Sequence, residues 1–337
     1  MIRVALDAMG GDNAPTVEID GAIRALRELP PGFVVQLVGQ SGVIEAELAK
    51  HPELDRSRLE VVEAPEVISM ADKPLAAIRK KQRSSIVIGL GLQKEGKSEA
   101  FVSAGNTGAV LAASTIFLGL HDGVDRATVA TLFPTTSRPA LVLDAGANVD
   151  CSAKELVCFA HLGTVYVRDL LGVPQPVVGL LNIGEEEEKG NAITKEAHQL
   201  LKQDTRLNYI GNIEGLDILA GHSKIGAVDV IVADGFVGNI VLKFYESVAR
   251  LIVRLVKKEA PGVMEREDVR QVFRILDYSE YGGAPLLGVK GVSIICHGSS
   301  TANAIKNAIR VAVQSVEAGL SNHIGAEFAQ REIPAQA

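Results

Sequence analysis

Short apolar runs rich in β-branched residues alternate along the chain with longer segments whose apolar positions recur at helical spacing. Eight runs have the length and composition of strands: IRVALDA, FVVQLVG, LEVVEA, AFVSA, PALVLDA, PVVGLLN, VDVIVAD and VSIICH. Strands separated by helices pair in parallel, because the crossover helix returns the chain to the same edge of the sheet. The pattern therefore predicts an α/β fold, a doubly wound and largely parallel sheet with helices on both faces.

No low-complexity linker, repeat or abrupt change of composition marks a domain boundary in residues 1–337. With 47% hydrophobic residues the chain can bury a substantial core. We expect a single α/β domain, which could be divided into two lobes around a cleft.

Polar, glycine-rich turns follow six of the predicted strands. They are DAMGGDNAPT, SAGNTGA, DAGANVDCS, NIGEEEEKGN, DGFVGN and HGSSTAN. In an open parallel sheet such turns lie beyond the carboxyl ends of the strands, where ligands bind. Helix capping and tight turning explain any one of them, but six on one edge favour a shared ligand crevice.

The turns supply groups suited to a small anion. Backbone amides, hydroxyls and carboxamides at helix N-termini can hold a phosphate, and the candidates are Gly10, Gly11, Asn106, Thr107, Asn148, Ser299 and Ser300, with Asp7 and Asp144 as orienting carboxylates. Asp7 and Asp12 could instead bind a divalent metal, although such a site needs further oxygen ligands. Asp12 and Asn13 could equally cap a helix that begins near Thr16.

The run EEEEKGN places Lys189 after four acids. Glu185–Glu188 are expected to form a solvated first helical turn, which the helix dipole favours over a metal cluster. Lys189 could meet an anion together with the amides of Gly190 and Asn191, or could simply pair with its acidic neighbours.

GLQKEGKS, from Gly91 to Ser98, matches the expression for a phosphate-binding P-loop. A P-loop needs a strand before it and a helix after it. Here the preceding residues have the pattern of a helix and the following EAFVSA that of a strand, so Gly96 is expected to end a helix. We interpret the match as accidental.

Composition excludes several classes of protein. A net charge of −7 and a pI near 5.6 lack the basic footprint of nucleic-acid binding. The three cysteines have neither disulfide nor zinc spacing, and no secretory signal follows Met1. The apolar run Ala109–Leu120 has the length of a buried helix rather than a membrane span. We expect a cytoplasmic protein without metal or cofactor.

Residues 243–285 are expected to be largely helical with a basic face. Apolar residues recur at helical spacing just before and within it, and they are Val237, Ile240, Val241, Phe244, Val248, Leu251, Ile252 and Leu255. An ordinary packed surface helix explains that stripe. The basic residues beside it could receive an acidic protein or an anionic membrane surface, and they are Lys243, Arg250, Arg254, Lys257 and Lys258.

Six motifs together resemble the bacterial phosphate acyltransferase (PlsX) family of phospholipid synthesis. They are LDAMGGD, SAGNTGA, LDAGAN, DGFVGNIVLK, DYSEYGGAPLLG and HGSSTANAIKNAI, in order from Leu6 to Ile309. The resemblance implies a fold similar to phosphotransacetylases and isopropylmalate dehydrogenases. It also implies transfer of a fatty acyl group from acyl carrier protein to inorganic phosphate, by a homodimer that lies peripherally at the membrane.

The resemblance points most directly to Lys189 and Asn239 as catalytic residues. In this hypothesis phosphate attacks the thioester directly, Lys189 neutralises phosphate or the developing oxyanion, and Asn239 donates a hydrogen bond to the carbonyl. Two alternatives compete with it. One is a nucleotide-dependent phosphotransferase or dehydrogenase on the same architecture, and the other is a non-enzymatic scaffold for acyl carrier protein or membrane that uses the basic helix alone.

Overall fold

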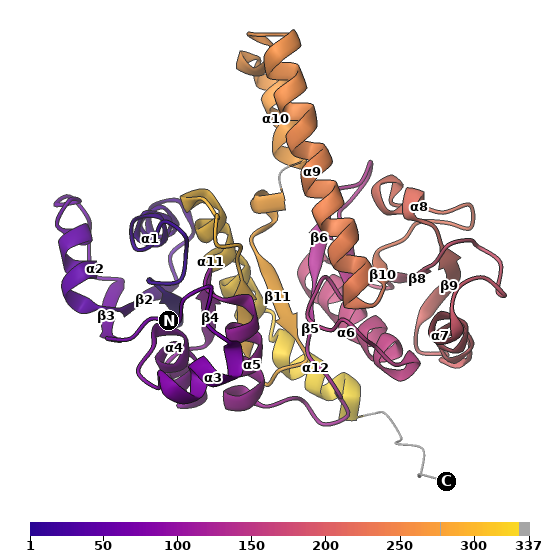
Figure 1. Cartoon of the computed structure of the whole chain (residues 1–337), viewed down its shortest axis with the longest axis horizontal. Helices are drawn as coiled ribbons and strands as arrows, with labels where there is room; N and C mark the ends of the chain where they lie inside the picture. Colours follow the sequence, from indigo (N-terminus) through magenta and orange to yellow (C-terminus); the bar gives the residue numbers. More distant parts are fainter. Residues whose placement is uncertain (277, 330–337) are drawn as a thin grey trace. The chain divides into compact units, whose positions relative to one another are not determined.

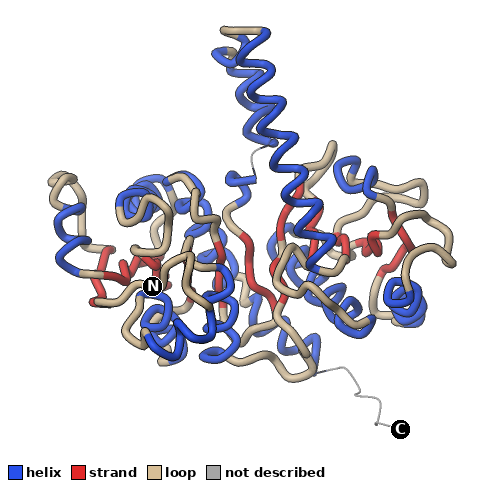
Figure 2. The backbone as a smooth tube through the Cα atoms, viewed as in Figure 1, coloured by secondary structure: helices blue, strands red, loops and turns tan. Residues whose placement is uncertain are grey.

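The computed structural model describes residues 1–276 and 278–329. The described chain folds into two compact units, residues 1–127 with 282–329 and residues 128–281. Figure 1 gives the element labels, and Figure 2 shows strands and helices alternating within each unit.

The first unit is built on a mostly parallel sheet in the order β3-β2-β1-β4-β12-β11, in which only β11 runs antiparallel, beside β12. Its strands are β1 (Ile2–Asp7), β2 (Phe33–Gly39), β3 (Leu59–Glu63), β4 (Ala100–Ser103), β11 (Ala284–Leu287) and β12 (Val292–Ile295). Its helices are α1 (Thr16–Glu28), α2 (Ser41–Leu48), α3 (Pro74–Lys80), α4 (Ser85–Lys94), α5 (Thr107–Leu118), α11 (Ala302–Glu317) and α12 (Leu320–Ala329).

Helices cover both faces of this sheet. Val4 and Leu6 of β1 belong to an apolar cluster that includes buried residues of α1 and α11. Alternate strand residues point to the opposite face, where α4 packs so closely that a β-carbon on Gly89 would collide with the ring of Phe101. Because β2 and β3 extend the sheet on one side of β1 and β4 extends it on the other, the order reverses between β1 and β4. That switch point is where ligands bind in open α/β sheets.

The second unit has its own sheet, in the order β6-β7-β10-β8-β9, parallel except for β6. The strands of this sheet are β6 (Thr131–Phe133), β7 (Ala140–Leu143), β8 (Val177–Leu181), β9 (Asn208–Ile213) and β10 (Val230–Val232), and the unit also contains β5 (Thr128–Val129), which is not one of its five strands. Its helices are α6 (Ala153–Leu171), α7 (Ala192–Gln203), α8 (Gly215–Ala220), α9 (Gly235–Glu259), η1 (Val263–Glu265), α10 (Glu267–Leu276) and η2 (Tyr278–Tyr281).

Helix α6 lies close against one face of the second sheet, because Gly163 has no side chain to hold it away from Val230 and Leu143. On the other face, Phe133 and Ile231 pack with Tyr245 of α9, whose ring centroid lies 5.4 Å from that of Phe133. The hydroxyl of Tyr245 donates a 2.7 Å hydrogen bond to the carbonyl of Leu276, which ties α9 to the end of α10.

All eight predicted strands are present, and so is the largely parallel α/β arrangement with helices on both faces. The strands are distributed between two sheets. The predicted order around the P-loop match is also confirmed, because α4 ends at Lys94, Gly96 follows with a φ of +68°, and β4 begins at Ala100. The P-loop match is therefore accidental.

The apolar stripe of α9 does not pack as an ordinary surface helix would. Val241 joins the apolar cluster of the second unit, but most of the stripe stays exposed: Val237, Ile240, Phe244, Leu251, Ile252 and Leu255. Figure 1 shows α9 running beside α10. Helix α10 adds the exposed Val272 and Ile275. Asp277, the first residue of the DYSEYGGAPLLG motif, lies outside the described residues.

Candidate functional site

Each unit carries three of the six polar turns at the carboxyl ends of three neighbouring parallel strands. In the first unit they follow β1, β4 and β12, and in the second they follow β7, β8 and β10. Within each sheet the strand order thus brings together turns that are far apart in the sequence. That all six face one crevice stays a prediction.

Asp7 is the fully buried carboxylate at the end of β1. Its Oδ2 accepts a 2.7 Å hydrogen bond from Ser103 Oγ at the end of β4, and its Oδ1 accepts one of 3.1 Å from the N–H of Met9. Burial raises the pKa of Asp7, against the opposing effect of hydrogen bonds from Ser85, Ser103 and Met9. The carboxylate therefore joins two strand ends.

Gly10 and Gly11 allow the turn after β1 to approach two carboxylates. A β-carbon on Gly10 would collide with Asp7 Oδ2 and lie 2.8 Å from the backbone nitrogen of Gly105, and one on Gly11 would collide with Glu18 Oε1. The N–H of Asp12 donates a 2.8 Å hydrogen bond to the carbonyl of Gly298, in the turn after β12. The three turns of this unit therefore form one continuous cluster.

Three helices, α1, α5 and α11, begin at these turns and direct the positive ends of their dipoles there. Thr107 is the exposed first residue of α5. Ser299 is also exposed, and its Oγ and its N–H both contact His297 Nδ1, at 2.7 and 3.2 Å. Ser300 follows, with its N–H bonded to the carbonyl of His297 at 2.9 Å.

The side chain of Asn106, a predicted phosphate ligand, caps a helix, whereas the cap expected from Asp12 or Asn13 does not form. Asn106 caps α5 through Oδ1, and its Nδ2 lies 3.1 to 3.3 Å from the carbonyls of three residues, Ser69, Met70 and Asp72. Its amide is thus committed to the protein's own backbone. The predicted cap on α1 by Asp12 or Asn13 is wrong, because Pro15 occupies the N-cap position without a side-chain cap.

Glu18 on α1 is a carboxyl that no pattern in the sequence singles out. Its side chain is only 1% exposed, and its Oε2 has no hydrogen-bond partner. Burial raises the pKa of Glu18 to about 7, with smaller contributions from the charges of Asp7 and Asp12. The first unit therefore keeps a carboxyl that titrates near neutral pH directly beneath the Gly-Gly turn.

In the second unit, Asp144 is fully buried at the end of β7 and organises the turn that follows. Its Oδ1 accepts hydrogen bonds from the N–H groups of Val129, Gly146 and Ala147 at 3.0 to 3.3 Å. Its Oδ2 accepts from the N–H and Nδ2 of Asn148, at 2.6 and 2.8 Å. Burial raises the pKa of Asp144, against the opposing effect of these bonds.

The turns after β7 and β10 meet around Asn239. A β-carbon on Gly146, whose φ is +129°, would lie 3.3 Å from both Cβ and Oδ1 of Asn239. Gly235 donates its N–H to the carbonyl of Asn148 at 2.8 Å, and a β-carbon on Gly238 would collide with the carbonyl of Asp144. Asn239 itself is exposed in the first turns of α9. It therefore stands at the positive end of that helix, close to Gly146.

Lys189 lies in the turn after β8, the strand beside β10. Its ammonium is 3.9 Å from Glu186 Oε2, and its side chain is 46% exposed. The predicted first helical turn at Glu185–Glu188 is wrong. Gly190 has a φ of +92°, which interrupts any helix there, and α7 begins only at Ala192 with Asn191 as its cap. The glutamates instead pair with Lys224 and Lys202 across the surface.

Comparison with known proteins identifies the family. The model of the fatty acid synthesis protein family matches residues 2–323. A protein of Desulforamulus reducens named phosphate acyltransferase is 49% identical over 327 residues, 95% of each chain. One of Heliobacterium modesticaldum with the same name is 47% identical and covers 96% of this chain and 98% of its own. The chain belongs to the fatty acid synthesis protein family.

Membership of the fatty acid synthesis protein family confirms the resemblance that the motifs carried. Solved structures show the same fold at low identity. They include a phosphotransacetylase from Streptococcus pyogenes, with a TM-score of 0.62 at 17% identity over 94% of each chain. Another is the EutD phosphotransacetylase from Staphylococcus aureus, with a TM-score of 0.60 at 14% identity, covering 93% of this chain and 94% of its own. The predicted fold similarity to phosphotransacetylases is therefore confirmed.

A groove of about 470 Å³ lies between α9 and the η1–α10 segment. Its lining combines apolar and basic side chains: Glu246, Ala249, Arg250, Val253, Arg254, Lys257, Met264, Phe273 and Leu276. Glu246 is largely buried there and accepts hydrogen bonds from Lys243 and Arg250. This family member therefore presents a basic, partly apolar groove apart from the turns that follow the strands.

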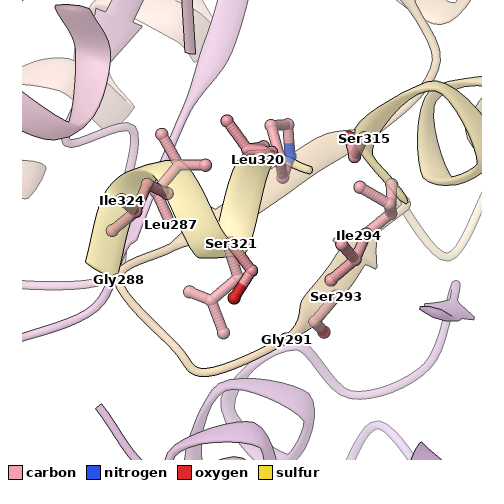
Figure 3. Close-up of a pocket in the computed structure, with 12 residues that line it drawn as sticks. Leu287, Gly288, Gly291, Ser293, Ile294, Ser315, Leu320, Ser321 and Ile324 are labelled. Atoms are coloured by element: carbon pink, nitrogen blue, oxygen red, sulfur yellow. The ribbon is translucent and has the colours of Figure 1, made fainter. Parts of the chain in front are cut away.

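A second cavity, inside the first unit, has room for about one water molecule, at about 10 Å³. Figure 3 shows Ser293 and Ile294 of β12 on one side of it and Leu320, Ser321 and Ile324 of α12 on the other. Ser315 Oγ, which also lines it, has no protein partner. The cavity is too small for a substrate.

Residues 1–276 and 278–329 lack two features that would change the interpretation of the site. No helix in these ranges is long and apolar enough to cross a membrane. No group of three or more His, Cys, Asp or Glu side chains in them is arranged to hold a metal ion.

Proposed function

We propose that this protein transfers a fatty acyl group from acyl carrier protein to inorganic phosphate and releases acyl phosphate. The observation that carries the proposal is near-full-length identity of 42 to 49% to proteins named phosphate acyltransferase. The polar turns at the strand ends support it, because they offer helix N-termini and backbone amides to an anion.

Direct attack by phosphate accounts for the groups present. A phosphate oxygen bonds to the thioester carbon, the carbonyl oxygen takes the negative charge, and the carbon–sulfur bond then breaks to release the thiolate. Phosphate is already anionic at neutral pH, so holding it against the carbonyl is the main task, and proximity can contribute up to about 7 to 11 kcal/mol.

In this proposal Lys189 neutralises phosphate or the developing oxyanion, and Asn239 donates a hydrogen bond to that oxygen. Their placement after the neighbouring strands β8 and β10 supports the pairing. Candidate phosphate ligands, through hydroxyls, backbone amides or a remaining carboxamide N–H, are Gly10, Gly11, Asn106, Thr107, Asn148, Ser299 and Ser300, with Asp7 and Asp144 as orienting carboxylates.

We further propose a homodimer that works in the cytoplasm and attaches peripherally to the membrane. The exposed apolar stripe of α9 supports both contacts, since an apolar face of this kind is typical of interaction surfaces. The basic groove between α9 and α10 supports an acidic carrier protein or anionic lipid as its partner.

The decisive experiment incubates the protein with acyl carrier protein thioester and labelled phosphate, with and without a chelator. Labelled acyl phosphate is the expected product, and hydroxylamine should convert it to the hydroxamate with release of the label. A parallel reaction with acyl coenzyme A identifies the preferred donor. Absence of labelled product at saturating substrates would refute the proposal, and loss of product only with chelator would add a metal to it.

A further inference from the structure

Two carboxamide side chains hold the backbone of the segment that ends in Lys189. Asn182 Nδ2 donates a 3.2 Å hydrogen bond to the carbonyl of Lys189. Asn212 Nδ2 donates one of 3.0 Å to the carbonyl of Glu186, which also accepts the N–H of Lys189 at 3.1 Å. The peptide groups on both sides of Lys189 are thereby linked to these two amides.

One amide lies in the sheet and the other is hydrogen-bonded to its edge. Asn212 lies within β9, opposite Leu180 of β8, and its side chain is 1% exposed. Asn182 directly follows β8, and its own N–H bonds to the carbonyl of Ile213 at 2.8 Å. Residues on strands hold a functional group more rigidly than residues on loops do.

The lysine ion pairs that also hold the segment are weak by comparison. The pairs Lys202–Glu187 and Lys224–Glu185 are 2.6 and 2.9 Å long, but the two lysines are 56% and 81% exposed. Exposed ion pairs of this kind contribute little to holding a conformation. The two amides therefore supply firmer contacts to the segment than these ion pairs do.

Burial of the Asn212 side chain is energetically unfavourable in one respect. Its Oδ1 is buried and has no hydrogen-bond partner. A half-satisfied buried amide is unfavourable compared with an apolar side chain of similar size. The hydrogen bond described for this side chain is the one from Nδ2 to the carbonyl of Glu186.

We propose that Asn182 and Asn212 are positioning residues that fix the backbone of Lys189 and so aim its ammonium at the reacting oxygen. The proposal rests on the catalytic role given to Lys189 under the proposed function. Asn182 follows β8 and Asn212 lies in β9. Both would act in catalysis by holding Lys189, without touching the substrate themselves.

The test uses Asn212→Leu, which keeps the side chain's size and removes the donor, and Asn182→Ala. Matched controls are Lys202→Gln and Lys224→Gln, which remove contacts to the same segment without touching the two amides. Turnover and the Michaelis constants for phosphate and thioester are measured for each variant. Hydrogen exchange of the peptide covering residues 183–190 is followed by mass spectrometry.

Each amide variant is expected to lower kcat about 10-fold at an unchanged Michaelis constant for thioester and to speed exchange in residues 183–190. The controls should change kcat by less than about twofold. In a Lys189→Met background, Asn212→Leu should have no further effect on kcat, which a merely structural role would not predict.

Unchanged hydrogen exchange in both amide variants would overturn the inference. It would also be overturned if both amide variants had a normal kcat and Lys189→Met had a lowered one. Faster exchange with a fully active Lys189→Met would refute the catalytic role of Lys189 and leave the backbone restraint standing. The failure of the inference is thus distinguishable from that of the proposed function.

Discussion

Lys189 and Asn239 offer a sharp test at the scale of single residues. Lys189→Met keeps the aliphatic stem and removes the cation, and Asn239→Ala or Asn239→Asp removes the amide donor. Both side chains are substantially exposed, so little thermal stability should be lost. We expect each variant to lower turnover by about 100-fold or more, measured as acyl phosphate formed per enzyme.

If both residues act on the same developing charge, the double variant should lose less than the product of the single effects. Near-normal turnover in Lys189→Met would mean that Lys189 only pairs with Glu186. A raised Michaelis constant for phosphate at constant turnover would mean that it binds the ground state.

Glu18 should make stability depend on pH near neutrality. Its pKa is about 7 in the folded chain against an ordinary 4.5, so between these values the folded state holds a proton that the unfolded state has lost. Stability therefore falls as pH rises through this window. We expect Glu18→Gln to gain about 2 kcal/mol in unfolding free energy relative to wild type between pH 5 and pH 8, measured by denaturant titration.

Glu63→Gln is the matched control for that titration. Hydrogen bonds from the hydroxyl and N–H of Ser41 lower the pKa of Glu63, so its contribution is lost only as pH falls below the ordinary value. Its stability curve should therefore run parallel to wild type from pH 5 to pH 8. A parallel curve for Glu18→Gln as well would contradict the burial argument.

Lys97→Ala should leave turnover nearly intact. Lys97 lies between the end of α4 and the start of β4, is 63% exposed, and pairs with Glu95 at 2.7 Å. The geometry that lets a P-loop lysine reach a phosphate is absent from this junction. A large loss of turnover in a folded variant would restore the nucleotide-dependent alternative.

Candidate site residues could be chosen from the sequence, but their hydrogen-bond partners could not. Asp7 and Asp144 could be chosen because each ends an apolar run, but Ser103, which holds Asp7, lies 96 positions away along the chain. Asn106 has the residue type of a phosphate ligand, yet carbonyls of the segment 69–72 occupy its amide. Neither contact has a local signature, because both arise from strand order.

At the scale of elements, the strands that consist of longer apolar runs were predicted, and strands that are short or polar were missed. The four missed strands are β5, β6, β9 and β11. Strands β5 and β6 have two and three residues, too few for a period, and β9 (NYIGNI) contains two asparagines and a glycine. The division into two sheets also escaped prediction, because residues 282–329 return to the unit that contains residues 1–127.

The binding role proposed for helix α9 depends on its basic side chains. Replacing Arg250, Arg254, Lys257 and Lys258 together by glutamine should weaken binding to acyl carrier protein or to vesicles of anionic lipid, and most strongly at low salt, where screening is least. Binding is measured by titration at several salt concentrations.

A variant with Arg27, Lys50, Arg56 and Lys97 changed to glutamine is the charge-matched control, since all four are exposed ion-pairing residues of the first unit. Equal affinity of the α9 variant and this control at low salt would reduce the basic face of α9 to an ordinary solvated surface.

At the scale of the whole molecule, the discontinuity of the first unit has a consequence for how the chain is made. Strand β12 lies between β4 and β11, and α11 supplies Ile305 and Ile309 to the core that contains Val4 and Leu6. A ribosome delivers these residues only after all of residues 128–281. The second unit is contiguous, so it can complete its fold first. Nascent chains stalled just after residue 281 has emerged from the ribosome should therefore yield a protease-resistant fragment near 128–281, while residues 1–127 stay cleavable until α11 has emerged.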